Sequence, residues 1–144
     1  PNNWTTASTA GNATLSQSTD AHGGQYAVEV TGINSANKRL AYKEMTLPAG
    51  TYTMKFYTKA ATATGGSVRP GYVPIKDDGS VGSYVYGDYV NDLKQGEWIL
   101  VTHEFTLAGE TKLSLVIMNS KNPGGNVLID DFTLTDGAGK AIIY

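Results

Sequence analysis

The chain has 144 residues and a mass of 15.3 kDa, which suits one domain, because a single core serves chains of up to roughly 150 to 200 residues. Eleven basic and thirteen acidic residues give a formal net charge of -2, so the chain lacks the cationic surface that binds nucleic acid or anionic membranes. Its longest apolar run, residues 115–118, is far shorter than the roughly 20 residues of a membrane-spanning helix. Because Pro1 is no translation start, we expect residues 1–144 to be one module excised from a larger multidomain protein.

Apolar and polar residues alternate along much of the chain, which is the period of a half-buried β-strand. In chain order, the pattern predicts strands at 26–30, 39–47, 51–60, 67–75, 98–107, 112–119 and 127–134. Residues 83–90 fit a short strand or an ordered loop, and turns rich in Pro, Gly and Asp separate the strands. No segment has a convincing helical period. The sequence therefore predicts an all-β fold, an antiparallel β-sandwich.

Side chains suited to covalent catalysis are sparse. The chain has no Cys and no G-x-S-x-G motif, and its two histidines stand apart in the sequence. We interpret His22, in a turn, and His103, in a strand, as solvent-facing or satisfied core imidazoles.

Glycoside hydrolases use a pair of carboxylates as acid and as base or nucleophile, so each pair of carboxylates in the chain is a candidate. Asp130 and Asp131 are adjacent in a predicted strand and should point to opposite faces, and Asp77 and Asp78 fit a turn. The pair formed by residues 88 and 92, both Asp, leaves a small glycosidase open, although a solvated loop is the simpler interpretation. We expect a protein that is not an enzyme.

Aromatic residues are the informative feature, because nine of them are tyrosines, which combine an apolar ring with a hydroxyl that tolerates water. Those with apolar neighbours at period two are expected in the core: Tyr52, Phe56, Trp98, Phe105 and Phe132. Tyr57 lies between Lys55 and Lys59 on the polar face of its strand. Tyr84, Tyr86 and Tyr89 fall within a stretch of six residues among Ser83, Gly87, Asp88 and Asn91, which is too polar a setting for three core side chains.

Exposed rings beside amides and cations suit a sugar, whose apolar C–H face stacks on an aromatic plane while its hydroxyls pair with polar groups. By position, the polar candidates are Arg69, Asp88, Asn91 and Asn119. The alternative is that the tyrosines only pack a long loop onto the sandwich.

Four segments carry a resemblance to a known family: GGQYAVEVTG at 23–32, LPAGTYTMKFYTKA at 47–60, EWILVTHEFTL at 97–107 and VLIDDFTL at 127–134. In this order and spacing, the chain resembles a carbohydrate-binding module of the family 4, 9 and 22 group over about residues 20–136. The resemblance implies a jelly roll with a concave ligand-binding sheet. It also implies a soluble β-linked polysaccharide as ligand, xylan first and β-glucan next, and attachment to a secreted bacterial glycoside hydrolase such as a xylanase. A structural or adhesive spacer of a surface protein, without a sugar ligand, stays open.

The resemblance also implies roles for particular residues. The family's stacking aromatic falls on Tyr57, further groove aromatics fall on the 84–89 segment, and a groove polar residue falls on Asn119. Arg39 and Tyr42 stand near the place of another groove aromatic. A structural calcium would use the carbonyl of Gln25 and the carboxylate of Asp130, and the alternative is that this carboxylate satisfies backbone groups at a strand end.

Overall fold

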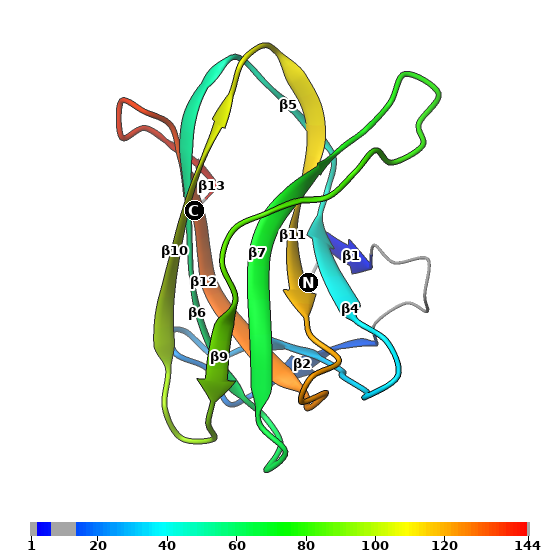
Figure 1. Cartoon of the computed structure of the whole chain (residues 1–144). Helices are drawn as coiled ribbons and strands as arrows, with labels where there is room; N and C mark the ends of the chain where they lie inside the picture. The colour runs from blue at the N-terminus through cyan, green and yellow to red at the C-terminus, as the bar shows by residue number, and fades with distance from the viewer. Residues whose placement is uncertain (1–2, 7–13, 144) are drawn as a thin grey trace.

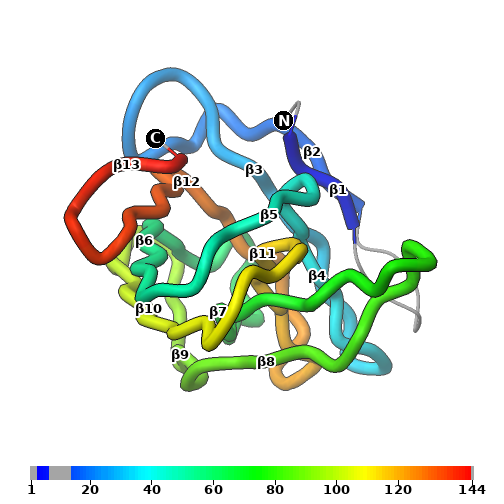
Figure 2. The backbone as a smooth tube through the Cα atoms, turned by 90° about the horizontal axis from the view of Figure 1, so that it is seen from above, coloured from blue at the N-terminus to red at the C-terminus, as the bar shows by residue number. Residues whose placement is uncertain are grey.

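The computed structural model describes residues 3–6 and 14–143, and they form two antiparallel sheets packed face to face (Figures 1 and 2). The seven-stranded sheet contains β1 (Trp4–Thr6), β4 (Lys38–Tyr42), β5 (Met45–Leu47), β7 (Gly66–Pro74), β8 (Val85–Tyr86), β9 (Val90–Leu93) and β11 (Thr111–Asn119). The six-stranded sheet contains β2 (Leu15–Ser18), β3 (Ala27–Val30), β6 (Gly50–Ala60), β10 (Ile99–Leu107), β12 (Val127–Thr135) and β13 (Ala141–Ile143). The predicted all-β jelly roll is confirmed.

Each sheet is organised around long strands at its centre. In the seven-stranded sheet, β11 lies between β4 and β7, while in the six-stranded sheet β6 lies between β10 and β12. No helix forms in the described part of the chain, and none there could therefore cross a membrane.

The core lies between the sheets and follows the predicted alternation. On β6, Tyr52, Met54 and Phe56 are buried, and Leu113, Leu115 and Ile117 meet them from β11. Removing such a side chain from water stabilises the fold by about 1.5 to 3 kcal/mol each. The intervening residues of β6 therefore face away from the core.

Several elements differ from the sequence expectation. The segment 39–47 divides into β4 and β5, which pair with different parts of β11. Trp98, expected in the core, is half-buried on the outer face, where it packs beside Lys59. Tyr26 is 52% exposed, because β3 begins only at Ala27. Short pairings by β1, β2 and β13 have no periodic signal, since strands of three or four residues are too short to show one.

Candidate functional site

The predicted aromatic residues lie on two different sheets. Tyr57 belongs to β6 in the six-stranded sheet, whereas Tyr86 is in β8, which pairs with β7 in the seven-stranded sheet. Both side chains point away from the core, so the sandwich separates them. The prediction of one groove that joins Tyr57 to the 84–89 tyrosines is therefore wrong, because the periodicity of a strand does not say which sheet it joins.

On the outer face of the seven-stranded sheet, three tyrosines and two arginines form a continuous row. We call Tyr84, Arg39, Tyr86, Arg69 and Tyr89 the tyrosine-arginine row. The Tyr84 and Tyr86 rings stack at 5.6 Å, and the Arg39 guanidinium lies 4.5 Å from the Tyr84 ring centroid. The Arg69 guanidinium lies 5.0 Å from the Tyr86 centroid and 4.5 Å from the Tyr89 centroid. Such cation–π contacts stabilise by about 0.5 to 2 kcal/mol each, so each arginine helps to hold the rings in place.

Hydrogen bonds fix the orientation of both arginines. Arg39 Nε donates to the Tyr86 hydroxyl over 2.6 Å, and Arg69 Nε donates to the Gly87 carbonyl over 2.7 Å. Burial raises the pKa of the Tyr86 phenol, although the hydrogen bond and charge of Arg39 act in the opposite direction. Tyr86 is consequently a neutral phenol at pH 7.

The row covers an apolar strip of the sheet. Ala41, Val73 and Val116 are buried on this outer face, and Tyr84 and Tyr86 pack against them. These two rings are half-buried, so the alternative that tyrosines pack a loop onto the sandwich describes them well. Tyr89 differs, because 46% of it is exposed. Among the three tyrosines, Tyr89 offers the most ring surface to a ligand.

A hollow of about 280 Å³ begins at Tyr89. We call it the row-end hollow, and its lining is polar apart from the tyrosine ring: Asn37, Ser67, Tyr89, Asn91, Ser120, Lys121 and Asn122. Several groups hold one another: Ser67 Oγ donates to Asn91 Oδ1 over 2.7 Å, and Asn37 Oδ1 accepts from the backbone N–H of Lys121 over 2.9 Å. Within the described part of the chain, the side-chain amide nitrogens of Asn37 and Asn91 make no hydrogen bond and remain as donors.

The ends of four distant segments build this hollow. β7 begins beside it, β11 ends beside it, β9 contributes Asn91, and Asn37 directly precedes β4 (lower end of Figure 1). Ser67 and Arg69 are two residues apart on β7, so both face outward. Arg69, Tyr89 and Asn91 are predicted from the sequence, whereas Asn37, Ser67 and Lys121 are not. Asn37 and Lys121 lie outside the strands and Ser67 is at the start of β7, so strand periodicity does not single them out as binding residues.

Two predicted ligand-binding residues are buried instead. Asn119 is 1% exposed, and its amide nitrogen lies 3.0 to 3.3 Å from the carbonyl oxygens of Val30, Thr31 and Gly125. Tyr42 is 8% exposed, and Trp4 meets it edge-on at 5.0 Å. Both predictions are wrong, since the alternation of β4 and β11 turns these side chains inward. Arg39, by contrast, reaches the row.

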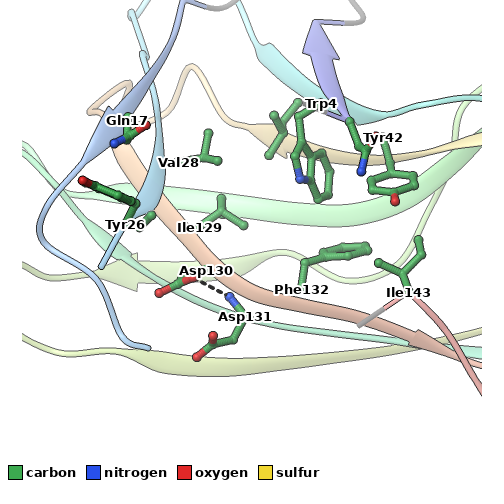
Figure 3. A pocket seen from close by; sticks show the side chains of 13 residues that line it. Trp4, Gln17, Tyr26, Val28, Tyr42, Ile129, Asp130, Asp131, Phe132 and Ile143 are labelled. Atoms are coloured by element: carbon green, nitrogen blue, oxygen red, sulfur yellow. Dashed lines mark hydrogen bonds between the residues drawn. The ribbon is translucent and has the colours of Figure 1, made fainter. Parts of the chain in front are cut away.

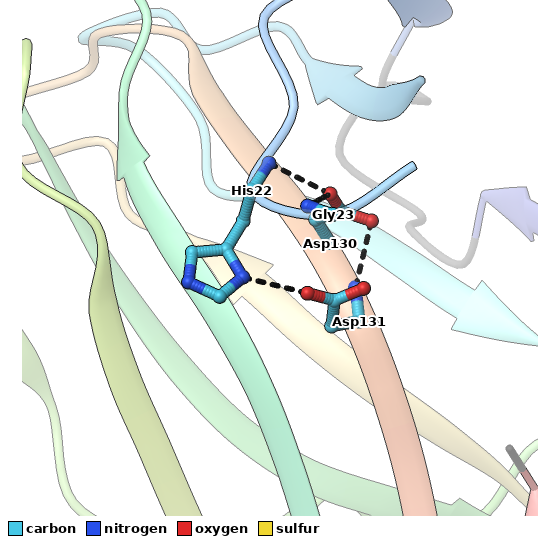
Figure 4. Close-up of polar contacts among 4 residues, drawn as sticks. All are labelled: His22, Gly23, Asp130 and Asp131. Atoms are coloured by element: carbon cyan, nitrogen blue, oxygen red, sulfur yellow. Dashed lines mark hydrogen bonds and ion pairs between the residues drawn. The ribbon is translucent and has the colours of Figure 1, made fainter. Parts of the chain in front are cut away.

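The Asp130 carboxylate, one of the two predicted calcium ligands, is held by backbone groups (Figure 4). One Asp130 carboxylate oxygen accepts from the backbone N–H groups of His22 and Gly23, and the other accepts from that of Asp131. N–H dipoles aimed at this carboxylate do not fit a calcium site, because a cation would face their positive ends. The described residues also contain no group of three His, Asp or Glu side chains that could share a metal ion. The alternative reading, a carboxylate that satisfies backbone groups, agrees with this geometry.

Tyr57 belongs to a second cluster, on the outer face of the six-stranded sheet. The His22 imidazole stacks on its ring at 3.6 Å, and His22 Nδ1 pairs with Asp131 Oδ2 at 2.6 Å. A bulge in β12 puts Asp131 at a φ of 51°, so both neighbouring aspartates serve the His22 loop, and the expectation that they point to opposite faces is wrong. This cluster pins the 20–25 loop, and His22 covers one face of the tyrosine ring.

A cavity of about 340 Å³ opens at the edge between the sheets (Figure 3). Trp4, Tyr42, Phe132 and Ile129 form its apolar wall, and Asp130 and Asp131 lie at one side. The cavity is an incompletely covered part of the core at the edge of the sandwich where β1 and β2 are the outermost strands of their sheets.

The carboxylates of the remaining candidate pair do different things. Asp88 lies near enough to His103 to raise the pKa of this imidazole, which burial lowers more strongly. Asp92 lines a separate hollow of about 700 Å³ together with Lys94 and residues 62–67. Their surroundings do not place them on the two sides of one substrate.

Comparison with solved structures finds several carbohydrate-binding modules with a similar fold. No family model and no curated protein matches the sequence. Among solved structures, the xylan-binding CBM22-1 domain of Xyn10C from Paenibacillus barcinonensis superposes with a TM-score of 0.73 at 14% identity, over 93% of this chain and 85% of that one. The C-terminal family 22 carbohydrate-binding module of Xyn10B from Clostridium thermocellum gives 0.68 at 14% identity, over 96% and 87%. The family 11 carbohydrate-binding module of Lic26A-Cel5E from Clostridium thermocellum gives 0.62 at 17% identity, over 94% and 88%. The chain therefore has the jelly-roll fold of these carbohydrate-binding modules, as its resemblance to the family 4, 9 and 22 group predicts.

Proposed function

We propose that this chain is a non-catalytic carbohydrate-binding module that binds a β-linked polysaccharide along the tyrosine-arginine row. The observation that carries the proposal is Tyr89, a ring 46% exposed beside the row-end hollow. Arg69 holds this ring in place, so little side-chain entropy is lost when a sugar stacks on it. The amides and hydroxyls of the hollow then pair with the equatorial hydroxyls of the sugar.

Xylan is the first candidate ligand, and β-glucan is the second. Support comes from the sequence resemblance and from the solved neighbour that is described as xylan-binding. The site is a shallow surface with an open end rather than an enclosed pocket, which suits the interior of a chain. Single-site affinity should lie in about the micromolar to millimolar range, because ordering a flexible oligomer offsets much of the contact energy.

In its natural setting, the module would be secreted or at the cell surface and joined to a bacterial glycoside hydrolase such as a xylanase. Its effect would be to raise the concentration of the attached enzyme on the polymer. A calcium ion is no part of the proposal, since Asp130 is engaged with backbone N–H groups.

The decisive test is calorimetric titration with xylohexaose. Both tryptophans lie away from the row, Trp4 in the core edge and Trp98 on the other sheet, so tryptophan fluorescence would be a poor reporter. Tyr89→Ala should weaken binding by about 1 to 3 kcal/mol, as expected for a lost aromatic platform. Tyr26→Ala is the matched control, because this tyrosine is similarly exposed but lies on β3's side of the sandwich.

Two results would contradict the proposal. Absence of heat with xylohexaose and with β-glucan oligomers would favour the structural spacer. A loss of affinity in Tyr57→Ala, with none in Tyr89→Ala, would move the site to the six-stranded sheet.

A further inference from the structure

Positive charge gathers at the row-end hollow, although the whole chain is slightly acidic. Arg39 and Arg69 belong to the row, Lys121 lines the hollow, and none of the hollow's seven lining residues is acidic. The chain's formal net charge is -2, so this concentration of cations is local. No sequence motif shows this cluster of cations, because Arg39, Arg69 and Lys121 are 30 and 52 positions apart.

Arg69 and Lys121 take part in none of the ion pairs found among the described residues. The three ion pairs in the described part of the chain all lie elsewhere: they join His22 to Asp131, Lys59 to Asp20, and Lys112 to Glu44. Arg69 Nε donates to a backbone carbonyl, and the guanidinium packs against the rings of Tyr86 and Tyr89. In the described part of the chain, no carboxylate forms an ion pair with Arg69. The Lys121 ammonium group likewise has no ion pair among the described residues, where the backbone N–H of Lys121 donates to Asn37 Oδ1.

The acids next to Tyr89 and Asn91 in the sequence, Asp88 and Asp92, lie against other groups. Asp88 acts on His103 in β10, and Asp92 faces the larger hollow, where Lys94 accompanies it. The two hollows share Ser67, Asn91 and Asn122, but Asp92 lines only the larger one and Lys121 lines only the row-end hollow.

A neutral sugar offers no negative charge that these cations could pair with. Hydroxyls are satisfied by amides and hydroxyls, of which the hollow has several, and a cation covered by a neutral ligand would lose hydration without compensation. A carboxylate accepts charge-assisted hydrogen bonds from both guanidinium and ammonium groups, which are roughly twice as strong as neutral ones.

We propose that the row-end hollow binds the carboxylate of a uronosyl residue carried by the polysaccharide, with Lys121 and Arg69 as its partners. The sugar ring of this residue, or of its backbone neighbour, stacks on Tyr89. This inference rests on the proposed function and makes it more specific: the preferred ligand is an acidic xylan rather than a neutral one.

The test compares two matched ligands by calorimetry at low and high salt. One is a xylo-oligosaccharide with a single uronosyl side group, and the other is the same compound after reduction of the carboxyl group to an alcohol. The acidic ligand should bind about tenfold more tightly at low salt, in line with the strength of charge-assisted hydrogen bonds, and the ratio should shrink at high salt. Free glucuronate should bind far more weakly, because it lacks the backbone that follows the row.

Variants identify the carboxylate's partner. Lys121→Gln should reduce the ratio of the two affinities severalfold, while Lys140→Gln, an exposed control before β13 in the other sheet, should leave it unchanged. Thermal unfolding establishes that both variants fold.

Three outcomes would overturn the inference. Equal binding of the two ligands at both salt concentrations refutes the carboxylate site and leaves the proposed function standing. An acidic preference that survives both in Lys121→Gln and in a folded Arg69→Gln variant places the carboxylate elsewhere. Failure of both ligands to bind refutes the proposed function and this inference together.

Discussion

Asn119 joins three separate backbone segments from inside the sandwich. Its Nδ2 group contacts the carbonyl of Val30 at the end of β3, that of Thr31 in the following loop, and that of Gly125 in the turn before β12. All three acceptors are carbonyl oxygens, which fixes the nitrogen on this side of the amide. The side chain is 1% exposed, so water cannot replace these contacts.

Asn119→Ala should therefore lower the free energy of unfolding by about 3 kcal/mol. Two lost N–H donors account for about 1 to 3 kcal/mol, and the small cavity adds about 1 kcal/mol. Asn119→Asp should cost more, although it leaves no cavity, because a carboxylate oxygen would face carbonyl oxygens. Asn3→Ala is the control, since this exposed side chain has no hydrogen bond in the described structure and its loss should change the stability by less than about 0.5 kcal/mol.

The assay is urea unfolding followed by circular dichroism. Each variant is also titrated with xylohexaose at a urea concentration well below its unfolding midpoint, where it is folded. We expect the order Asp, then Ala, then the control, from the least stable to the most stable, and a folded Ala variant that still binds sugar. A loss of stability below about 0.5 kcal/mol in both Asn119 variants would refute the reasoning. So would a fully stable variant that no longer binds, because it would restore Asn119 as a ligand-binding residue.

Two further predictions concern His103 in β10 and the close approach of β8 to Gly71 in β7. Burial lowers the pKa of His103 in the folded state below its value in the unfolded chain. As the pH falls, the imidazole is therefore protonated more readily in the unfolded state, and stability is lost below about pH 6.5. The difference in unfolding free energy between wild type and His103→Gln should thus change between pH 7.5 and 5, by at most about 1.4 kcal/mol per pH unit, and a flat difference would contradict this. Gly71→Ala should destabilise the chain and weaken xylohexaose binding, because its Cβ would meet the Val85 carbonyl and the Tyr86 backbone, which must move and carry the row with them. An unchanged melting temperature together with unchanged affinity in that variant would show that β8 does not depend on this close approach.

Local patterns in the sequence were enough for the class of fold and for the long strands. Side chains alternate with period two along β6 and β11, and this alternation reflects only the pleat of one strand and the burial of one of its faces. The same local reasoning identified an unusually polar run of tyrosines at 84–89 and a carboxylate, Asp130, at a strand end.

Only the tertiary structure decided where these features meet. Strands β6 and β7 are consecutive long strands but join different sheets, which separates Tyr57 from Tyr89. The β12 bulge turns Asp131 to the same loop as Asp130, an outcome that the regular alternation of a strand excludes. Asn37, Ser67 and Lys121 become neighbours because β4, β7 and β11 pair side by side, and the energy of such pairing depends on contacts between segments that are distant in the sequence.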